Sequence, residues 1–266
     1  MYWQKRFNRI NQKQNLEDKI QEICRDNKNF GYRRVWGVLR RQGQKINKKC
    51  VQRIMRKLKL QVTSFTRKSR KYSSYKGRVG KIMRNRINRR FKTNVIHQKI
   101  TTDTSEFKYY EVDNNGHMVI KKLYIDPFMD MFNSEIISYS ISKRPSAEGI
   151  MSALKKAIEI TSDCPYRRTF HSDRGWAYQM KSYTNELGKN KIFQSMSRKG
   201  NCYDNSIMEN FFGIMKQEMY YGHTYYSYEE LSKAIEQFIQ YYNKQRIKEK
   251  LGWMSPVEYR LNSSLA

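Results

Sequence analysis

Cysteine and histidine are scarce and scattered in this chain of 266 residues. Its four cysteines occur singly, without a Cys-x-x-Cys pair, and its four histidines form no His-x-x-x-His pair. Disulfide frameworks and structural zinc fingers depend on such clusters, so the sequence argues against both kinds of site. The chain also contains no P-loop, and we therefore expect no nucleotide cofactor.

Long apolar runs are absent as well. No stretch approaches the roughly 20 apolar residues that span a bilayer, and residues 1–12 are basic but lack the apolar segment of a secretory signal. The hydrophobic content of 38% is enough for a folded core without being typical of a membrane protein. These features predict a cytoplasmic protein without a membrane partner.

Acidic residues are scarce in the first third of the chain. Residues 1–95 hold 30 of the 53 lysines and arginines but only four of the 24 acidic residues. The remaining residues are nearly balanced, with 23 basic and 20 acidic side chains. Positive charge concentrated in this way favours a polyanionic partner, and DNA is the best match.

Apolar periodicity in residues 1–60 predicts a small all-helical domain, with Asn47 as a good N-cap for its third helix. Three short helices with a turn at residues 42–44 are typical of a helix-turn-helix-like module, although protein-interaction modules share the pattern. The apolar sets at helical spacing are Leu16, Ile20 and Ile23; Val35, Val38 and Leu39; and Val51, Ile54, Met55 and Leu58. The candidate DNA contacts are Arg33, Arg40, Arg53, Arg56 and Lys57.

Residues 61–93 have the composition of a basic linker. They are rich in Lys, Arg, Ser and Gly, with interleaved tyrosines and no sustained period. Such a segment is expected to be mobile alone and to become ordered along a nucleic acid, with Tyr72 or Tyr75 stacking on bases. A flexible hinge with incidental charge is the alternative.

Residues 94–266 show the pattern of an α/β domain. Strand-like runs at 99–112 and 117–125 flank an Asp-Asn-Asn-Gly hairpin signal, and a third run follows at 135–141. Helices and short strands then alternate, which predicts a mixed sheet covered by helices. We expect helices at 146–160, 182–187, 205–220 and 228–242, and short strands at 167–170 and 191–194.

Three acids stand at places where catalytic groups concentrate. Asp103 lies in the β-branched segment ITTDTSEF, and Asp173 lies between an expected strand and a glycine turn. Glu209 lies just past the first turn of the helix that begins near Asn205, with Lys216 on the same face two turns later. Three converging carboxylates repel one another without a divalent cation, so the set implies Mg²⁺.

Several motifs resemble one family in the same order: TDTSEF, HSDRGWAY, SRKGNCYDN, ENFFGIMK and YYNKQRIKEKLGWMSPVEY. They are similar to the second-frame (OrfB-type) transposases of the insertion sequence 3 family, which have a retroviral-integrase-like DDE core. The likeness covers roughly residues 15–259. It implies a helix-turn-helix-like domain at 1–60, a linker at 61–93 and a ribonuclease H-like catalytic core at 94–266. The zinc-binding module of retroviral integrases has no counterpart here.

The resemblance also implies an activity and partners. The protein would cleave DNA at insertion-sequence ends and transfer strands, with Asp103, Asp173 and Glu209 as catalytic residues that hold two Mg²⁺ or Mn²⁺ ions about 3.5–4 Å apart. Lys216 would contact DNA near the reacting end. A homo-oligomer on DNA, fusion to or association with the upstream-frame protein, and a bacterial cytoplasmic, nucleoid-associated location are expected. An inactive DNA-binding regulator and a ribonuclease H-type nuclease are the alternatives.

Other acids in the strand region compete with Asp103 for the first catalytic place. Asp113 is explained by its turn, where aspartate bonds its own backbone. Asp126 precedes a proline at a strand end, and Asp130 begins a bend. Glu106 lies three residues after Asp103 on the same expected strand and therefore points to the opposite face.

The region around Glu209 has rivals and neighbours of its own. Asp204 is interpreted as a helix cap, and Glu218 lies about 180° around the helix from Glu209, so it cannot share the site. His171 receives no role. Two asparagines lie beside the site and are candidates to orient ligands or DNA: Asn201 and Asn205.

The chain departs from the family pattern at three positions. Arg174 and Ala177 replace residues that are glutamine in many relatives, and Lys248 stands where histidine is frequent. Arg174 is expected to place a cation beside Asp173 and favour its ionised form, or instead to compete with the metal or contact phosphate. None of these departures removes a predicted ligand.

Overall fold

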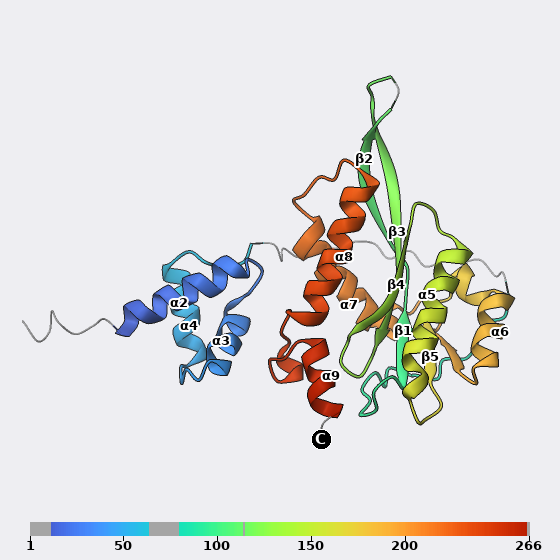
Figure 1. The fold of residues 1–266 in the computed structure, drawn as a ribbon, viewed down its shortest axis with the longest axis horizontal. Helices are drawn as coiled ribbons and strands as arrows, with labels where there is room; N and C mark the ends of the chain where they lie inside the picture. Colours follow the sequence, from blue (N-terminus) through green and yellow to red (C-terminus); the bar gives the residue numbers. More distant parts are fainter. Residues whose placement is uncertain (1–11, 64–79, 114, 265–266) are drawn as a thin grey trace, which may run out of the picture. The chain divides into compact units, whose positions relative to one another are not determined.

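The computed structural model describes residues 12–63, 80–113 and 115–264. The chain divides into two compact units, one formed by residues 1–68 with 247–254 and the other by residues 69–246 with 255–266 (Figure 1). The basic N-terminal stretch and the two tyrosines expected to stack, Tyr72 and Tyr75, lie outside the described residues. Within the described ranges, no helix has the length and apolarity needed to cross a membrane.

The first unit contains the three helices that its periodicity predicts. They are α2 (Gln12–Asp26), α3 (Tyr32–Arg41) and α4 (Lys48–Lys57), and their apolar faces are buried against one another. The Oδ1 atom of Asn47 accepts a hydrogen bond of 2.9 Å from the backbone N–H of Lys49, which confirms the predicted cap of α4. The helix-turn-helix-like prediction therefore agrees with the local structure.

A segment from the far end of the sequence completes this unit. Within residues 247–254, the Trp253 ring makes an edge contact with the Trp36 ring at a centroid distance of 5.7 Å. The carbonyl of Trp253 accepts a hydrogen bond of 3.1 Å from Arg41, and a Cβ atom at Gly37 would overlap the Trp253 ring. The motifs predict that these residues belong to the catalytic core, whereas their contacts group them with α3.

The second unit is built around one mixed sheet. β1 and β2 both pair antiparallel with β3, one after the other along the same side, and β4 pairs antiparallel with the other side of β3. On the far side of β1, β5 pairs parallel with β1, and β6 pairs parallel with β5. This arrangement confirms the predicted hairpin and the predicted mixed α/β fold. The strands are β1 (Lys99–Thr102), β2 (Ser105–Val112), β3 (Met118–Asp130), β4 (Ile136–Ser142), β5 (Thr169–Ser172) and β6 (Phe193–Met196).

The strand predicted over residues 99–112 is interrupted at Asp103. Thr102 is opposite Phe128 and Ser105 is opposite Ile125, so one register runs through the gap and places Asp103 opposite Pro127. Proline has no N–H to donate to a neighbouring strand. The backbone carbonyl of Asp103 therefore receives no hydrogen bond from position 127, and β1 ends just before it.

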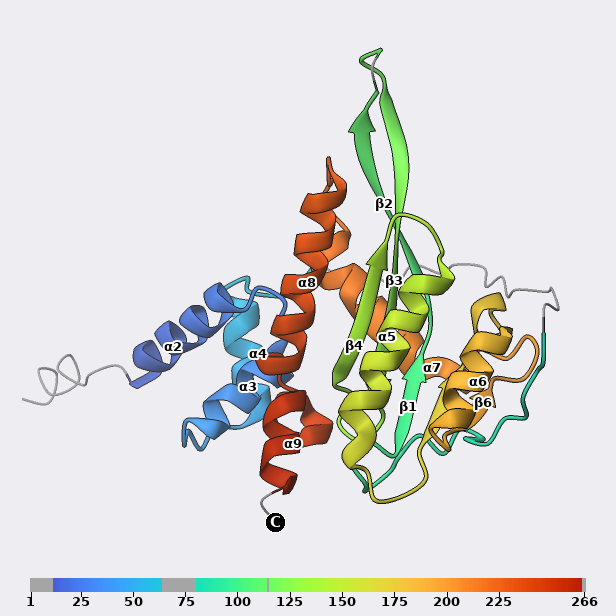
Figure 2. The same ribbon diagram turned by 45° about the vertical axis from the view of Figure 1, so that its right-hand side comes forward.

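Helices cover both faces of the sheet (Figures 1 and 2). One apolar cluster joins Phe107 and Leu123 of the hairpin to α7 and α8, and a second joins Ile100 and Phe170 to α5 and α6. The α-helices are α5 (Ala147–Ile160), α6 (Lys181–Lys189), α7 (Ser206–Met215), α8 (Tyr228–Lys244) and α9 (Pro256–Ser264). The short helices are η1 (Thr161–Asp163), η2 (Trp176–Gln179), η3 (Cys202–Asn205), η5 (Glu249–Leu251) and the π-helical η4 (Lys216–Tyr220), which continues α7.

The described part of the predicted linker is folded. Residues 80–92, here called the strap, run past β6 and α6 (Figure 2). The backbone N–H of Gly80 donates to the Gln179 side chain at 3.3 Å, and that of Arg86 donates to Ser195 Oγ at 2.9 Å. The prediction of a mobile linker is therefore wrong for these residues, because side chains distant in the sequence hold their backbone.

Candidate active site

Asp103 and Asp173 lie at the carboxyl ends of neighbouring parallel strands. Thr101 of β1 pairs with His171 of β5, so the same register carried two residues further aligns Asp103 with Asp173. Each carboxylate is oriented by its own loop: Asp103 Oδ1 accepts the Thr104 N–H at 2.9 Å, and Asp173 Oδ1 accepts the Gly175 N–H at 2.7 Å. The sheet thus brings together two acids separated by seventy positions in the sequence.

Asn205 fixes the start of α7 against the end of β1. Its Oδ1 atom accepts a hydrogen bond of 2.7 Å from the Thr101 hydroxyl, and its Nδ2 group donates to the Thr102 carbonyl at 3.1 Å. Glu209 follows four residues later, one helical turn along the same face. This buried anchor brings Glu209 into the electrostatic neighbourhood of Asp103.

The three acids share one electrostatic field. Burial raises the pKa of Asp103 well above its usual range, and the negative charges of Asp173 and Glu209 raise it further. Burial also raises the pKa of Asp173, and partial desolvation raises that of Glu209. In the part of the chain that the structure describes, however, no three His, Cys, Asp or Glu side chains are grouped closely enough to form a ready metal site.

Arg174 does not act on Asp173 as the sequence analysis expected. Its Nε group donates a hydrogen bond of 2.8 Å to the carbonyl of Ser197. The pKa of Asp173 is raised by burial and is lowered only by the hydrogen bond from Gly175. The expected stabilisation of the ionised form by Arg174 is therefore wrong, because the guanidinium faces the loop after β6.

Tyr178 lies beside the carboxylates, and the sequence analysis missed it. Its ring is buried, and its hydroxyl lies 3.4 Å from Thr104 Oγ1, which in turn donates to Asp126 Oδ1 at 2.6 Å. Burial raises the pKa of Tyr178 well above its usual range, and the charges of Asp126, Asp103 and Asp173 raise it further. The phenol is therefore a neutral group beneath the site, which only its position after a glycine turn could have suggested.

The other acids of the strand region have separate partners. Asp130 is paired with Ile100 at the amino end of β1 and accepts two backbone N–H groups, and burial raises its pKa to about 6. Asp113 accepts two N–H groups of its own turn, as predicted. Glu106 forms an ion pair of 3.0 Å with Lys122. Each of these acids is thus explained by local structure.

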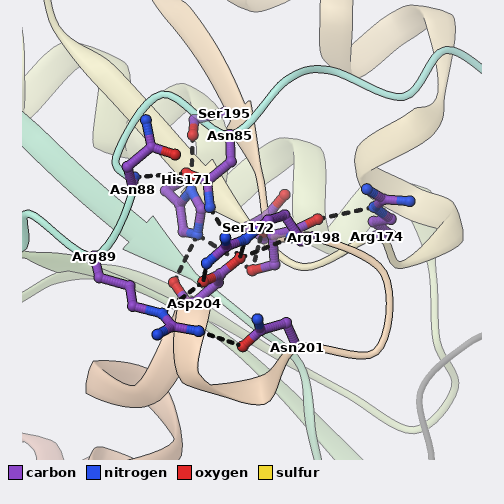
Figure 3. Close-up of polar contacts among 11 residues, drawn as sticks. Asn85, Asn88, Arg89, His171, Ser172, Arg174, Ser195, Arg198, Asn201 and Asp204 are labelled. Atoms are coloured by element: carbon purple, nitrogen blue, oxygen red, sulfur yellow. Dashed lines mark hydrogen bonds and ion pairs between the residues drawn. The ribbon is translucent and has the colours of Figure 1, made fainter.

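Asp204 is held by cations and does not cap α7. Its fully buried carboxylate accepts hydrogen bonds from Arg198 at 2.8 and 2.9 Å, from Arg89 at 3.1 Å and from Asn85 at 3.0 Å (Figure 3). Its hydrogen bond to Arg198 holds its pKa below the usual range. The N-cap position belongs to Asn205, whose side chain makes no cap bond. The predicted capping role of Asp204 is wrong.

His171 joins β5, β6 and the segment before α7 (Figure 3). Its Nε2 atom lies 2.9 Å from the carbonyl of Asp204, which can only accept, so Nε2 carries the proton. Nδ1 then accepts from the Ser195 hydroxyl at 2.8 Å, and Ser195 Oγ accepts the Arg86 N–H. The sequence assigned His171 no role, and the structure makes it a neutral link between three segments.

This environment predicts a pH-dependent stability. Burial lowers the pKa of His171 to about 4, from 6.5 in the unfolded chain. Unfolding therefore takes up a proton as the pH falls through this range, and the folded state loses about 3 kcal/mol of stability between pH 6.5 and pH 4. Urea denaturation at pH 7 and pH 4.5 measures this contribution, as the difference between the native chain and a variant that lacks the imidazole.

The matched variant for that measurement is His171→Gln, which is less stable at pH 7 but has no imidazole to titrate. The comparison is needed because Asp130, with a pKa of about 6, titrates in the same range with the opposite sign. The native chain should lose more stability than the variant between the two pH values. Equal losses would show that the imidazole is not held neutral by the fold.

The predicted DNA contacts differ in their surroundings. Lys57 forms an ion pair of 2.8 Å with Glu17, which neutralises it. Lys216 begins η4, and its ammonium lies 5.1 Å from the centre of the Phe107 ring. The remaining candidates are exposed on α3 and α4: Arg33, Arg40, Arg53 and Arg56.

Comparison with known proteins assigns most of the chain to described families. Residues 11–69 match an HTH-like domain, and residues 95–202 and 209–265 match integrase core domains. The putative transposase InsK for insertion sequence element IS150 of Escherichia coli is 41% identical over 92% of this chain and 82% of its own length. The chain belongs to the insertion sequence 3 family of transposases.

Other members of the transposase family agree with this assignment. An uncharacterized transposase-like protein of Haemophilus influenzae is 45% identical over 84% of this chain and 97% of its own length. Transposase InsF for insertion sequence IS3A of Escherichia coli is 28% identical over 99% of this chain and 89% of its own. The resemblance, the ribonuclease H-like fold class and the transposase function expected from the motifs are therefore confirmed.

Solved structures with integrase catalytic cores also match this transposase. The HTLV-2 integrase catalytic core domain, solved in complex with magnesium, covers 62% of this chain and 97% of its own with 15% identity and a TM-score of 0.45. The two integrase-core matches within the transposase include Asp103, Asp173 and Glu209 among their residues.

Proposed function

We propose that this transposase cuts DNA at the ends of its insertion sequence and transfers strands by phosphoryl transfer, with Asp103, Asp173 and Glu209 as its catalytic acids. The observation that carries the proposal is the parallel register of β1 and β5, which aligns Asp103 with Asp173 at one edge of the sheet. Two observations support including Glu209: its charge acts on Asp103, and Asn205 holds the start of α7 to the end of β1. Acids brought together at strand ends are suited to metal-dependent chemistry.

The three acids fit a divalent cation by their chemistry. They offer only carboxylate oxygens, which are hard ligands suited to Mg²⁺ or Mn²⁺. Burial and mutual repulsion raise the pKa of Asp103, and a bound cation would offset both effects. The side chains must close around the ions on binding. When two ions are bound, they stabilise the charge on the attacking and leaving oxygens of the transferred phosphoryl group.

The protein's own residues orient these acids. The Thr104 and Gly175 N–H groups each fix one carboxylate oxygen, and Asn205 fixes the helix that presents Glu209. Tyr178 is buried beside these acids, with its hydroxyl 3.4 Å from Thr104 Oγ1. Such support holds catalytic groups in place before the substrate arrives.

DNA binding is shared between the two units in this proposal. The exposed arginines of α3 and α4 contact phosphates, Lys57 does so once released from Glu17, and Lys216 contacts DNA near the reacting end. The transposase acts as a homo-oligomer on DNA, in fusion or association with the protein of the upstream frame.

The test is strand transfer of a labelled oligonucleotide that carries the terminal sequence of the element, with Mg²⁺ or Mn²⁺. Glu209→Gln should lower product formation at least about 1,000-fold, because it removes one charged ligand of the site. The control is Glu159→Gln, which changes an exposed acid of α5 and should leave the rate unchanged.

A fusion to the upstream frame completes this experiment. Product from the fusion alone, lost with Glu209→Gln in the fusion, would support the catalytic site and assign end recognition to the upstream protein. Full activity of Glu209→Gln would refute the proposed site. A native chain and a fusion that both bind DNA and metal but make no product would instead favour an inactive regulator.

A further inference from the structure

The strap, residues 80–92, is strongly basic. It contains no acidic residue and six cations: Lys81, Arg84, Arg86, Arg89, Arg90 and Lys92. Six positive charges in thirteen residues repel one another unless other groups or a ligand neutralise them. Which of these cations have partners within the protein therefore decides what the strap can bind.

The backbone of the strap is fixed at the carboxyl end of β6 and by Lys99 of β1. Near the carboxyl end of β6, the Met83 N–H lies 3.4 Å from the sulfur of Met196, and Ile87 is buried. At the end of the strap, the ammonium group of Lys99 donates to the carbonyls of Arg90 and Lys92 at 2.8 and 3.2 Å. The strap therefore runs from the sheet edge that carries the candidate acids towards the amino end of β1.

Two of the six cations are used inside the protein. Arg89 donates to the buried carboxylate of Asp204 at 3.1 Å. The guanidinium of Arg86 lies 4.1 Å from the centre of the Phe193 ring, which Arg167 also approaches to 3.6 Å. These contacts attach the strap to β6 and to the loop before α7.

The other four cations remain exposed, and none has a carboxylate partner among the described residues: Lys81, Arg84, Arg90 and Lys92. Burial and the charge of Arg90 lower the pKa of Lys99, as expected in an uncompensated positive field. Ile82 is the one large apolar side chain that the described strap exposes. A protein interface has an apolar centre, whereas a row of cations suits a phosphate backbone.

We propose that the strap is a preformed DNA-binding surface of the catalytic unit, on which Lys81, Arg84, Arg90 and Lys92 contact phosphates of the DNA that extends from the active site. This inference rests on the proposed function, which supplies DNA as the substrate. The contacts are independent of sequence, because cations at exposed positions meet the backbone and read no base. The Arg89–Asp204 ion pair joins this surface to the segment that precedes Glu209.

The test measures how salt weakens binding of the full chain to a duplex of arbitrary sequence, by fluorescence anisotropy. The strap variant replaces the four exposed cations by glutamine, and the control replaces four exposed lysines of α5, α6 and α8: Lys155, Lys181, Lys189 and Lys233. The slope of log K against log salt is negative, and each lost phosphate contact makes it less steep by about 0.9. We expect the magnitude of the slope to fall by about 3 to 4 for the strap variant and by less than about 1 for the control.

Two double variants, Lys81→Gln with Arg84→Gln and Arg90→Gln with Lys92→Gln, should each lower the slope by about 2 and stand in if the fourfold variant fails to fold. An unchanged slope in the strap variants, or an equal fall in the control, would overturn the proposal and leave the proposed function intact. A native chain that binds no DNA at low salt would overturn both.

Discussion

Replacing Asp103 by asparagine should abolish strand transfer and, at the same time, make the protein more stable. Activity should fall at least about 1,000-fold, because the substitution removes a charged ligand at the centre of the proposed site. The free energy of unfolding at pH 7.5 without divalent ions should rise by about 1–2 kcal/mol, because a buried and repelled carboxylate is removed. Thermal unfolding and strand transfer of the same preparations measure the two effects.

The expected rise in the free energy of unfolding follows from the raised pKa of Asp103. A carboxyl whose pKa is higher in the folded than in the unfolded protein stabilises the fold below the unfolded value of 3.8, and this contribution is lost as the pH rises through the folded value. At neutral pH the ionised side chain is therefore unfavourable. Asp18→Asn, an exposed change in α2, is the control and should alter neither property. A less stable Asp103→Asn variant with full activity would contradict the assignment.

Breaking the ion pair between Glu218 and Arg246 should strongly destabilise the catalytic unit. The two groups are 2.7 Å apart, and their side chains are only 1% and 3% exposed. Arg246→Met removes the guanidinium that pairs with this buried carboxylate, and breaking a buried ion pair typically costs about 3–5 kcal/mol. Urea denaturation at pH 7 measures the loss.

A second substitution separates charge from packing. Adding Glu218→Gln to Arg246→Met removes the buried negative charge that faced Arg246, so the double variant should be more stable than Arg246→Met alone. If the double variant were the less stable of the two, the ion pair would not be the cause. The pair matters for function because Glu218 lies in η4, directly after the helix that presents Glu209, and Arg246 follows α8.

Local patterns predicted most of the elements. The helical period identified α2, α3 and α4, and Asn47 capped α4 as expected, because both depend on neighbouring residues. The Asp-Asn-Asn-Gly turn likewise predicted the β2–β3 hairpin. The interruption at Asp103 could not be predicted, since it depends on pairing with β3 at Pro127.

The site depended more on long-range contacts. The sequence proposed Asp103, Asp173 and Glu209, but it could not supply the register that aligns the two aspartates or the bonds of Asn205 to β1. It misplaced Asp204 as a cap because the partners of its carboxylate include Arg89, more than one hundred residues earlier. Tyr178 was missed because its burial beside the acids is a property of the assembled fold.

The most direct test of the central claim is a titration of the folded transposase with Mn²⁺, followed by electron paramagnetic resonance, for the native chain and three single variants. Asp103→Asn, Asp173→Asn and Glu209→Gln should each weaken the same binding event at least about tenfold, while Glu159→Gln binds like the native chain. Native-like Mn²⁺ binding in all three variants, with the fold intact, would show that these acids do not form one metal site.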